Sequence, residues 1–594
     1  MKLRWFWQKL DYIILALLVV GFFVASSLFN YYTQEPGYVK FLSPDETANY
    51  FFARHYAESG VISVFEPANL IAEEVVQPRS IRSDHGWLKP VSFLGIILVY
   101  GKIASVFGTG VIPYLTPFFA SLGILFFYGF VRKLFGRQAA IIAASLLAAF
   151  PVYFFYTTRS MFHNIIFTFF LLGGAFFLVY SVGPKENEKT KFLSFKLKAS
   201  QWWMFLWSFL AGICFGGAAG ARSSELLWLA PVLFIAWLFY ARRLGLTRLV
   251  LMASGIILAL LPIFYWNQIL YSSPFYGGYG EMNQSISQIT KASSNLVQST
   301  VKGNFSQYRA VADTLMENIF YFGYQPYQSL KMFYYYVVVM FPILVGLAFV
   351  GGIVFLTRLR RKSIRPAMLY IVSWIVLSVI LVFYYGSWKF NDNPDPSRFT
   401  IGNSYTRYWL PMYIMALPFA ALAISFFARL LSKIVWLKPG VEWRTRSRRL
   451  IADGSAFMMT GLVMFFFFIF TVFGSEEGLI NLYYNHAIDK ANAEAILEIT
   501  PENAIIMTQY HDKQLFPDRK VINALLTNDT VNASVGKILE HYPVYYFNFA
   551  FPEKDLIYLN ERRLPNFGFT LELLMRRGRF GLYELKAIEE LPAQ

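Results

Sequence analysis

Two adjacent carboxylates, Asp45 and Glu46, follow the first apolar segment of the chain in the run Ser43-Pro44-Asp45-Glu46. Such a pair can begin a helix, because Ser43 can cap it, Pro44 suits its first turn and acidic side chains complement its dipole. A carboxylate held at a membrane surface can also take a proton from an attacking hydroxyl group. Both interpretations stay open, and Asp45 and Glu46 are the candidate catalytic residues.

Basic residues recur at the turns beside the apolar segments, where a cation can bind a phosphate group. The candidates for phosphate binding are Lys89, Arg159, Arg222 and Arg407, and Arg82, His85, His163 and Asn164 are further candidates that could line the same site. Each cation could equally anchor the chain at the membrane interface. Three arginines and a lysine on one face beside an acidic pair are harder to explain as anchors. A lone His163 without Cys, Asp or Glu at ligand spacing does not support a metal site.

The composition indicates what kind of chain holds these residues. Of 594 residues, 56% are hydrophobic and only 15% are charged, and the mean hydropathy is +0.43. About a quarter of the residues in a soluble globular domain are charged, so a cytosolic enzyme is excluded and a polytopic membrane protein is indicated. The single cysteine, Cys214, permits no intrachain disulfide. The net charge of +17 has to be judged against where the basic residues lie.

Apolar runs that can cross a bilayer, which takes about 20 residues, occur about eleven times. They lie near residues 12–29, 112–130, 138–156, 162–182, 203–219, 224–240, 247–267, 333–357, 367–386, 408–428 and 455–474. Basic clusters precede the first run and follow every second one, so the positive-inside rule places them, and the amino terminus, in the cytoplasm. The basic excess is therefore topogenic, and no nucleic-acid partner is expected. A further apolar run, 91–107, would reverse this pattern if it crossed, so we expect an interfacial or re-entrant helix there on the outer face.

The fold class that follows is an all-α polytopic membrane protein with a small carboxy-terminal α/β domain outside the membrane. Residues 1–474 form the transmembrane domain and residues 475–594 the soluble domain. Residues 31–110 form a first outer loop with surface helices, and residues 268–331 a second large outer loop. In the carboxy-terminal part, alternating runs at 504–508, 544–549 and 580–585 predict strands, and the segment 571–577 predicts a helix.

The order of these features resembles the GT-C superfamily of integral membrane glycosyltransferases, in particular the branch with protein O-mannosyltransferase-like enzymes and lipid A aminoarabinose transferases. The resemblance covers about residues 45–411. It rests on the acidic pair, on Lys89-Pro90 before an apolar helix, on Arg132-Lys-Leu-Phe-Gly-Arg137 before the turn of Arg159, and on Arg407-Tyr-Trp-Leu-Pro411. In this branch the turn after the arginine usually ends in an acidic residue, where this sequence has Asn164. An amide neither balances a cation nor acts as a base, so a metal at that turn is not supported.

The resemblance implies a GT-C fold, an active site at the outer membrane face and a polyprenyl-phosphate-linked sugar as donor. It implies that Asp45 or Glu46 is the catalytic base and that Lys89 and Arg159 lie near the donor phosphate. The acceptor stays open between protein, glycan and lipid. No cofactor is required, and a divalent metal stays open as an alternative that no ligand spacing supports. A single displacement would invert the anomeric configuration. The alternatives are a transporter or flippase of a lipid-linked sugar and a scaffold without activity, each as a multi-pass protein of the plasma membrane.

Overall fold

The computed structural model describes residues 2–588 apart from 36, 183–198, 281, 286, 289, 292–293, 295–315, 321–322, 359–363, 391, 393–394, 396, 435–442 and 475. Within these residues nine helical segments are long and apolar enough to cross a membrane, and two bent pairs of helices bring the number to eleven. The single spans lie in α1 (Lys2–Thr33), α5 (Ile112–Phe135), α8 (His163–Ser181), α9 (Ala199–Ala221), α10 (Leu226–Tyr271), α15 (Ile364–Gly386), α17 (Leu410–Ile434) and α18 (Trp443–Phe473). Each predicted span overlaps one of these eleven, so the polytopic helical fold is confirmed. Much of the predicted outer loop 268–331 falls outside the described residues.

Helix α10 runs through two of the spans and is interrupted at Gly245, near the start of the second one. This residue has a positive φ of 66° and a ψ of 167°, a conformation that interrupts the helix and that glycine adopts without steric cost. The two spans are Ser223–Ala241 and Arg243–Tyr271. The sequence predicted this division from the basic residues between two apolar runs.

The bent pairs break where a proline begins the second helix. Helices α6 (Arg137–Ala149) and α7 (Pro151–Arg159) meet at 50°, and the segment Pro326–Val339, which contains α13 (Pro326–Phe333) and η3 (Tyr334–Val339), meets α14 (Pro342–Arg358) at 92°. Proline disfavours helical geometry in the residue before it, and Phe150 is accordingly extended at φ −60° and ψ 124°. The first bend makes α7 a short separate helix that ends at Arg159.

The first outer loop contains both helices and a small antiparallel sheet. Its elements are α2 (Pro44–Ser59), β1 (Val64–Phe65), α3 (Ala68–Ile71), β2 (Ile81–Asp84), β3 (Trp87–Pro90) and α4 (Leu94–Phe107), with strand order β1-β3-β2. Helix α4 has 14 residues, about 21 Å of helix, and is too short to cross a hydrocarbon core of about 30 Å. It packs closely on α2 because Gly101 has no side chain: a Cβ there would lie 2.8 Å from the carbonyl oxygen of Ala53. The sequence predicted the surface helices but not the sheet.

The carboxy-terminal part forms a mixed five-stranded sheet after the long helix α19 (Leu479–Ile499). The strands are β4 (Ile505–Met507), β5 (Lys520–Ile522), β6 (Val544–Phe549), β7 (Phe569–Arg577) and β8 (Phe580–Ala587), in the order β5-β4-β6-β8-β7. Strand β4 is parallel to both its neighbours, and β8 is antiparallel to both of its own. The connections contain α20 (Asp512–Leu515), α21 (Asp529–Ile538) and α22 (Glu553–Tyr558).

The predicted helix over 571–577 is wrong, since these residues belong to β7. Leu571 to Arg577 contain several good helix formers, but they pair along their length with β8 across a tight turn at Gly578, which has φ 56°. Strand pairing with a partner that buries Phe569 and Leu571 therefore outweighs local helix propensity. The three predicted strands are confirmed as β4, β6 and β8.

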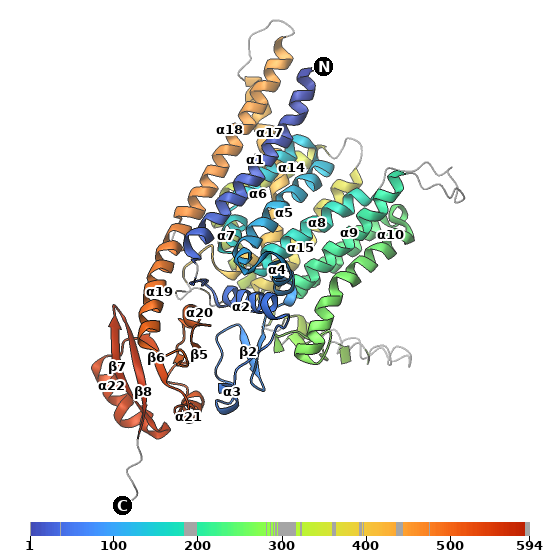
Figure 1. The fold of residues 1–594 in the computed structure, drawn as a ribbon. Coiled ribbons are helices and arrows are strands. Elements are labelled where there is room, and N and C mark those ends of the chain that lie inside the picture. The colour runs from blue at the N-terminus through green and yellow to red at the C-terminus, as the bar shows by residue number, and fades with distance from the viewer. Residues whose placement is uncertain are drawn as a thin grey trace, which may run out of the picture.

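The first outer loop lies between the spans and the carboxy-terminal sheet (Figure 1). Ala68, Ala72 and Val76 of the loop share one hydrophobic core with the sheet, including Ile505 and Ile522. Ion pairs fasten the two parts together: Lys40 with Asp518 at 2.8 Å, Arg79 with Asp512 at 2.6 Å and Lys520 with Glu66 at 2.5 Å. The sheet thus covers the loop that contains the acidic pair.

Candidate active site

The acidic pair lies in the first turn of α2, as predicted. Ser43 occupies the N-cap position in extended conformation, but its side chain makes no capping hydrogen bond, so the predicted cap is not formed. Successive residues of a helix point about 100° apart, and the two carboxylates accordingly reach different partners. Asp45 keeps 36% of its side chain exposed, whereas Glu46 keeps only 1%. Only the first of these carboxylates is therefore open to a substrate.

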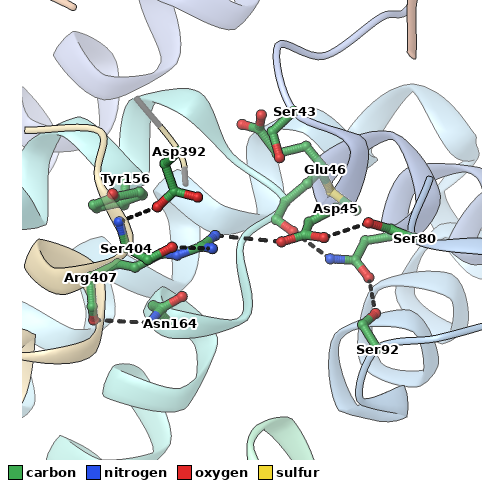
Figure 2. Close-up of polar contacts among 12 residues, drawn as sticks. Ser43, Asp45, Glu46, Ser80, Ser92, Tyr156, Asn164, Asp392, Ser404 and Arg407 are labelled. Carbon is green, nitrogen blue, oxygen red and sulfur yellow. Dashed lines mark hydrogen bonds and ion pairs between the residues drawn. The ribbon is translucent and has the colours of Figure 1, made fainter. Parts of the chain in front are cut away.

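Asp45 accepts a hydrogen bond from Ser80 and forms an ion pair with Arg407. Its Oδ1 lies 2.6 Å from the Ser80 hydroxyl and its Oδ2 lies 3.5 Å from Arg407 Nη1 (Figure 2). Burial raises the pKa of the Asp45 carboxyl, but Arg407 and the Ser80 hydroxyl outweigh burial and hold the pKa below its ordinary value. Ser80 has a positive φ of 62°, which costs a non-glycine residue about 1–3 kcal/mol and tends to occur at functional sites. Asp45 is therefore ionised at neutral pH and held in one orientation.

Glu46 is buried and binds Arg159 at the end of α7. Its Oε2 lies 2.8 Å from Arg159 Nη2. Burial raises the pKa of Glu46 to about 7, against the opposing effect of the Arg159 guanidinium. The residue after the arginine, Ser160, has φ 67° and ψ 178°, a region that is almost exclusive to glycine. The turn that orients Arg159 is therefore strained and fixed by its surroundings.

Arg407 lies on the short helix α16 (Ser404–Tyr408), which several polar contacts hold in place. Asp392 accepts a hydrogen bond from the Ser404 amide at 2.6 Å, and Arg407 Nη2 donates to the Ser404 hydroxyl at 2.7 Å (Figure 2). Asn164 donates from Nδ2 to the carbonyl oxygen of Arg407 at 2.9 Å. The amide at position 164 therefore holds the backbone of α16, a contact that a carboxylate could not donate.

Arg222 begins the turn between α9 and α10 and is buried. Its Nη2 lies 2.9 Å from Glu225 Oε1 and donates to the Tyr385 hydroxyl at 3.2 Å. Tyr385 in turn donates to Glu225 at 2.8 Å, so the three side chains form a closed polar group. The guanidinium of Arg222 lies 4.4 Å from the ring centre of Tyr408.

Two aromatic rings connect the three arginines into one row. Phe162 lies between Arg159 and Arg407, whose guanidinium carbons are 5.0 Å and 5.1 Å from its ring centre. Tyr408 lies between Arg407 and Arg222, at 5.1 Å and 4.4 Å. Cations over aromatic faces gain about 0.5–2 kcal/mol each, which helps to hold positive charges near one another. Of the four residues predicted to bind phosphate, Arg159, Arg222 and Arg407 therefore lie in one continuous row, and Lys89 does not belong to it.

Several buried nitrogen atoms in and beside this row have no partner in the described part of the chain. They are Nε of Arg159, of Arg222 and of Arg407, together with both ring nitrogens of His163. His163 is 8% exposed and lies at the first turn of α8, directly after Phe162. Buried polar groups in native proteins nearly always find a partner. Unpartnered N–H groups on three neighbouring guanidiniums are what an anionic ligand would satisfy.

The hairpin of β2 and β3 contains the other three predicted residues. Lys89 forms an ion pair with Asp84 at 2.7 Å, and Arg82 lies opposite Lys89 in the strand register. The His85 side chain is 96% exposed at the turn. Among the described residues, none of the three forms a hydrogen bond or an ion pair with Asp45 or with the row of arginines. The site residues predicted from the sequence did not include Ser80, Phe162, Tyr408, Glu225 and Tyr385.

No group of three or more His, Cys, Asp or Glu residues in the described ranges is arranged to hold a metal ion. His163 is surrounded by Arg222, Arg407 and the ring of Phe93. Among the described residues, Asp45 is the one carboxylate that acts on His163, and Ser80 and Arg407 already engage it.

Comparison with known proteins identifies the class of fold. No protein-family profile and no curated protein sequence matches the chain. Among solved structures, the chain is similar to the oligosaccharyltransferase AglB of Archaeoglobus fulgidus, crystallised with a tethered acceptor peptide. The TM-score is 0.56 at 15% identity over 98% of this chain and 74% of that one. A second structure of AglB, with an inhibitory peptide and a dolichol-phosphate, gives 0.52 at 14% identity over 99% and 75%.

The chain is equally similar to ArnT of Cupriavidus metallidurans, crystallised with undecaprenyl phosphate. Here the TM-score is 0.53 at 12% identity, over 97% of this chain and 98% of that one. AglB and ArnT are both membrane glycosyltransferases of the GT-C superfamily. The chain therefore has the GT-C fold, as the resemblance in its sequence predicted, and at these identities the likeness establishes the fold alone.

Proposed function

We propose that this protein is a glycosyltransferase that moves a sugar from a polyprenyl-phosphate donor to an acceptor hydroxyl at the outer face of the membrane. The observation that carries the proposal is the position of an ionised, partly exposed carboxylate, Asp45, beside three buried guanidiniums with unpartnered N–H groups. This arrangement offers a base to a hydroxyl and an anion site to a phosphate. The GT-C fold supports it, since structures with this fold include ArnT bound to undecaprenyl phosphate and AglB in complex with a dolichol-phosphate.

In the proposed reaction the acceptor oxygen attacks the anomeric carbon of the donor sugar. Asp45 takes the hydroxyl proton, the bond between that carbon and the phosphate oxygen breaks, and polyprenyl phosphate leaves with the bonding electrons. One displacement of this kind inverts the anomeric configuration. Positively charged donors aimed at the developing charge are commonly the largest contribution to catalysis. Arg159, Arg222 and Arg407 would supply them, while Lys89 is a weaker candidate because Asp84 already binds it.

The two other acidic residues of the site, Glu46 and Glu225, act through the arginines. Glu46 orients Arg159, and Glu225 together with Tyr385 orients Arg222. We place the amino terminus in the cytoplasm, because the basic clusters lie on the same side of the spans as the amino terminus. With eleven spans, the site and the carboxy-terminal residues 475–594 are then on the outer face. The division into residues 1–474 and 475–594 is part of the same proposal, with residues 68–76 packed on the sheet of the second part.

The test is donor cleavage by the purified full-length protein in lipid nanodiscs. A polyprenyl phosphate labelled in its sugar is offered, and released or transferred sugar is counted. We expect cleavage by the wild-type protein, and a loss in Arg222→Gln relative to the control Arg563→Gln, whose guanidinium pairs with Asp529 at the start of α21 in the carboxy-terminal part. The same donor in sealed vesicles distinguishes the transporter. Movement of intact donor across the bilayer without cleavage would overturn the proposal.

A further inference from the structure

A cavity of about 330 Å³ lies between the first outer loop and the carboxy-terminal sheet. Sites for small ligands usually measure about 300–1,000 Å³, so this cavity can hold a molecule of the size of one or two sugar rings. Its lining combines polar and apolar side chains from both parts of the chain: Glu74, Gln77 and Arg79 from the loop, and Ile522, Asn523 and Val531 from the sheet and α21. The mechanism described above uses none of these residues.

The lining offers no unpaired cation to a ligand. Arg79 donates from Nε and Nη2 to Asp512, which is fully buried. The Glu74 carboxylate accepts hydrogen bonds from the Ser83 hydroxyl and from the Gly86 amide. An anionic ligand is therefore disfavoured in this cavity, and a neutral ligand is not.

Three side chains of the lining have N–H groups that are free to bind a ligand. Gln77 uses its oxygen to accept from the Ser83 amide at 2.5 Å, which leaves its NH₂ group available. Within the described part of the chain, Nη1 of Arg79 and the side-chain amide of Asn523 also have no protein partner. Amide and guanidinium N–H groups beside apolar residues suit a neutral ligand with several hydroxyl oxygens.

One wall of the cavity is formed by the segment of the loop that also holds the candidate base. Pro78, Arg79 and Ile81 line the cavity, and Ser80, which lies between them in sequence, donates to Asp45 at 2.6 Å. A ligand in the cavity therefore binds to the same backbone segment that orients Asp45.

A peptide ligand fits this place less well. Extended peptides commonly bind by adding a strand to an exposed sheet edge. The edge strand here, β5, has only three residues, and the carbonyl oxygen of Ile522 at the cavity already accepts from the amides of Thr508 and Ala524. The residues that line the cavity come from the loop, from the sheet and from α21, and none of them belongs to a span. This position does not suit a lipid chain.

From these observations we infer that the cavity is an acceptor subsite for a saccharide, so that the acceptor of the transfer is a glycan. The inference rests on the proposed glycosyl transfer at Asp45. Donor cleavage in the absence of any acceptor tests that function separately, because water can then replace the acceptor.

The experiment compares acceptor use by the full-length protein and three variants. The probes are neutral oligosaccharides of two to four units and, separately, hydroxyl-bearing peptides, each offered with the labelled donor. Val531→Phe fills the cavity, and Ala533→Phe adds the same ring at an exposed position of the same helix as control. Asn523→Ala removes one free amide at an exposed position, so this variant should keep the fold intact. It provides the test if Val531→Phe does not fold.

We expect label to pass to a saccharide, with an acceptor KM raised roughly tenfold in Val531→Phe and several-fold in Asn523→Ala relative to Ala533→Phe. If the wild-type protein cleaves the donor but labels only peptides, the inference is overturned while the proposed function stands. An acceptor KM that is the same in all three variants also overturns it. Absence of donor cleavage by the wild-type protein refutes the proposed function itself.

Discussion

Replacing Asp45 by Asn tests the role of the base most directly. The amide keeps the size of the side chain and can still accept from the Ser80 hydroxyl, which lies 2.6 Å away. It cannot take a proton, so turnover should fall about 10²–10⁴-fold, the usual contribution of a general base. This loss corresponds to about 2.7–5.4 kcal/mol of activation free energy.

The cost to stability should be much smaller. The ion pair between Asp45 and Arg407 spans 3.5 Å, and 36% of the Asp45 side chain is exposed to water. Loss of this ion pair should therefore cost about 1 kcal/mol of unfolding free energy. The Ser43 side chain, not Asp45, occupies the capping position, and it makes no cap hydrogen bond to lose. The substitution should therefore cost several times more in activation free energy than in unfolding free energy.

The assay measures kcat for donor cleavage and transfer, with circular dichroism to count folded protein. Glu58→Gln is the matched control, because it neutralises a carboxylate of the same helix that pairs with Arg54 at the surface. Its turnover should match the wild type. A folded Asp45→Asn protein with the same turnover as Glu58→Gln would refute the assignment, and the pair would then only begin a helix.

Three further predictions follow from the same geometry. Replacing Arg159 by Gln should raise the donor KM about 10–150-fold, the equivalent of about 1.5–3 kcal/mol for one charge-assisted hydrogen bond, and an unchanged KM would remove this residue from the phosphate site. Burial raises the pKa of Glu46 to about 7, so raising the pH through 7 should ionise it, tighten its hold on Arg159 and increase the donor KM. That step should vanish in Glu46→Gln, and its persistence there would assign it to another group. In a Cys214→Ser background, an impermeant thiol reagent should label Asn528→Cys from outside the cell and Lys433→Cys only after permeabilisation, and the opposite pattern would contradict the topology.

The spans could be predicted because the bilayer imposes its length on the sequence. A run of about 20 apolar residues crosses whatever its neighbours are, and basic clusters mark one side of the membrane. The bent pair α6 and α7 was predicted as a single span, since Pro151 interrupts a run that stays apolar throughout. The strand β7 was missed because its residues favour a helix and only β8, its partner, determines otherwise.

The charged residues of the site could be predicted from the sequence, but the contacts between them could not. Asp45, Arg159, Arg222 and Arg407 stand out because a charge beside an apolar span is costly unless it is solvated or used. Phe162 and Tyr408, which lie between the guanidiniums, carry no such signal in a chain where 19% of residues are aromatic. The sequence does not distinguish Lys89 from the arginines. In the structure, the hairpin of β2 and β3 brings Asp84 to Lys89. The strands of that sheet have only two to four residues.

The contact between Asp45 and Arg407 has a consequence for the proposed transfer. Before reaction the guanidinium of Arg407 lies 3.5 Å from the carboxylate of Asp45 and 5.1 Å from the ring centre of Tyr408. When the acceptor proton reaches Asp45, that carboxylate loses its charge. At the same moment the leaving phosphate gains one negative charge. The favourable partner of Arg407 therefore changes from Asp45 to the phosphate, with no change in the total charge of the site. A guanidinium shared in this way stabilises the leaving group more in the transition state than in the ground state, which is the condition for an interaction to raise kcat. Arg407→Gln should consequently lower kcat more than it raises the donor KM, and the opposite ratio would show that Arg407 only binds the donor.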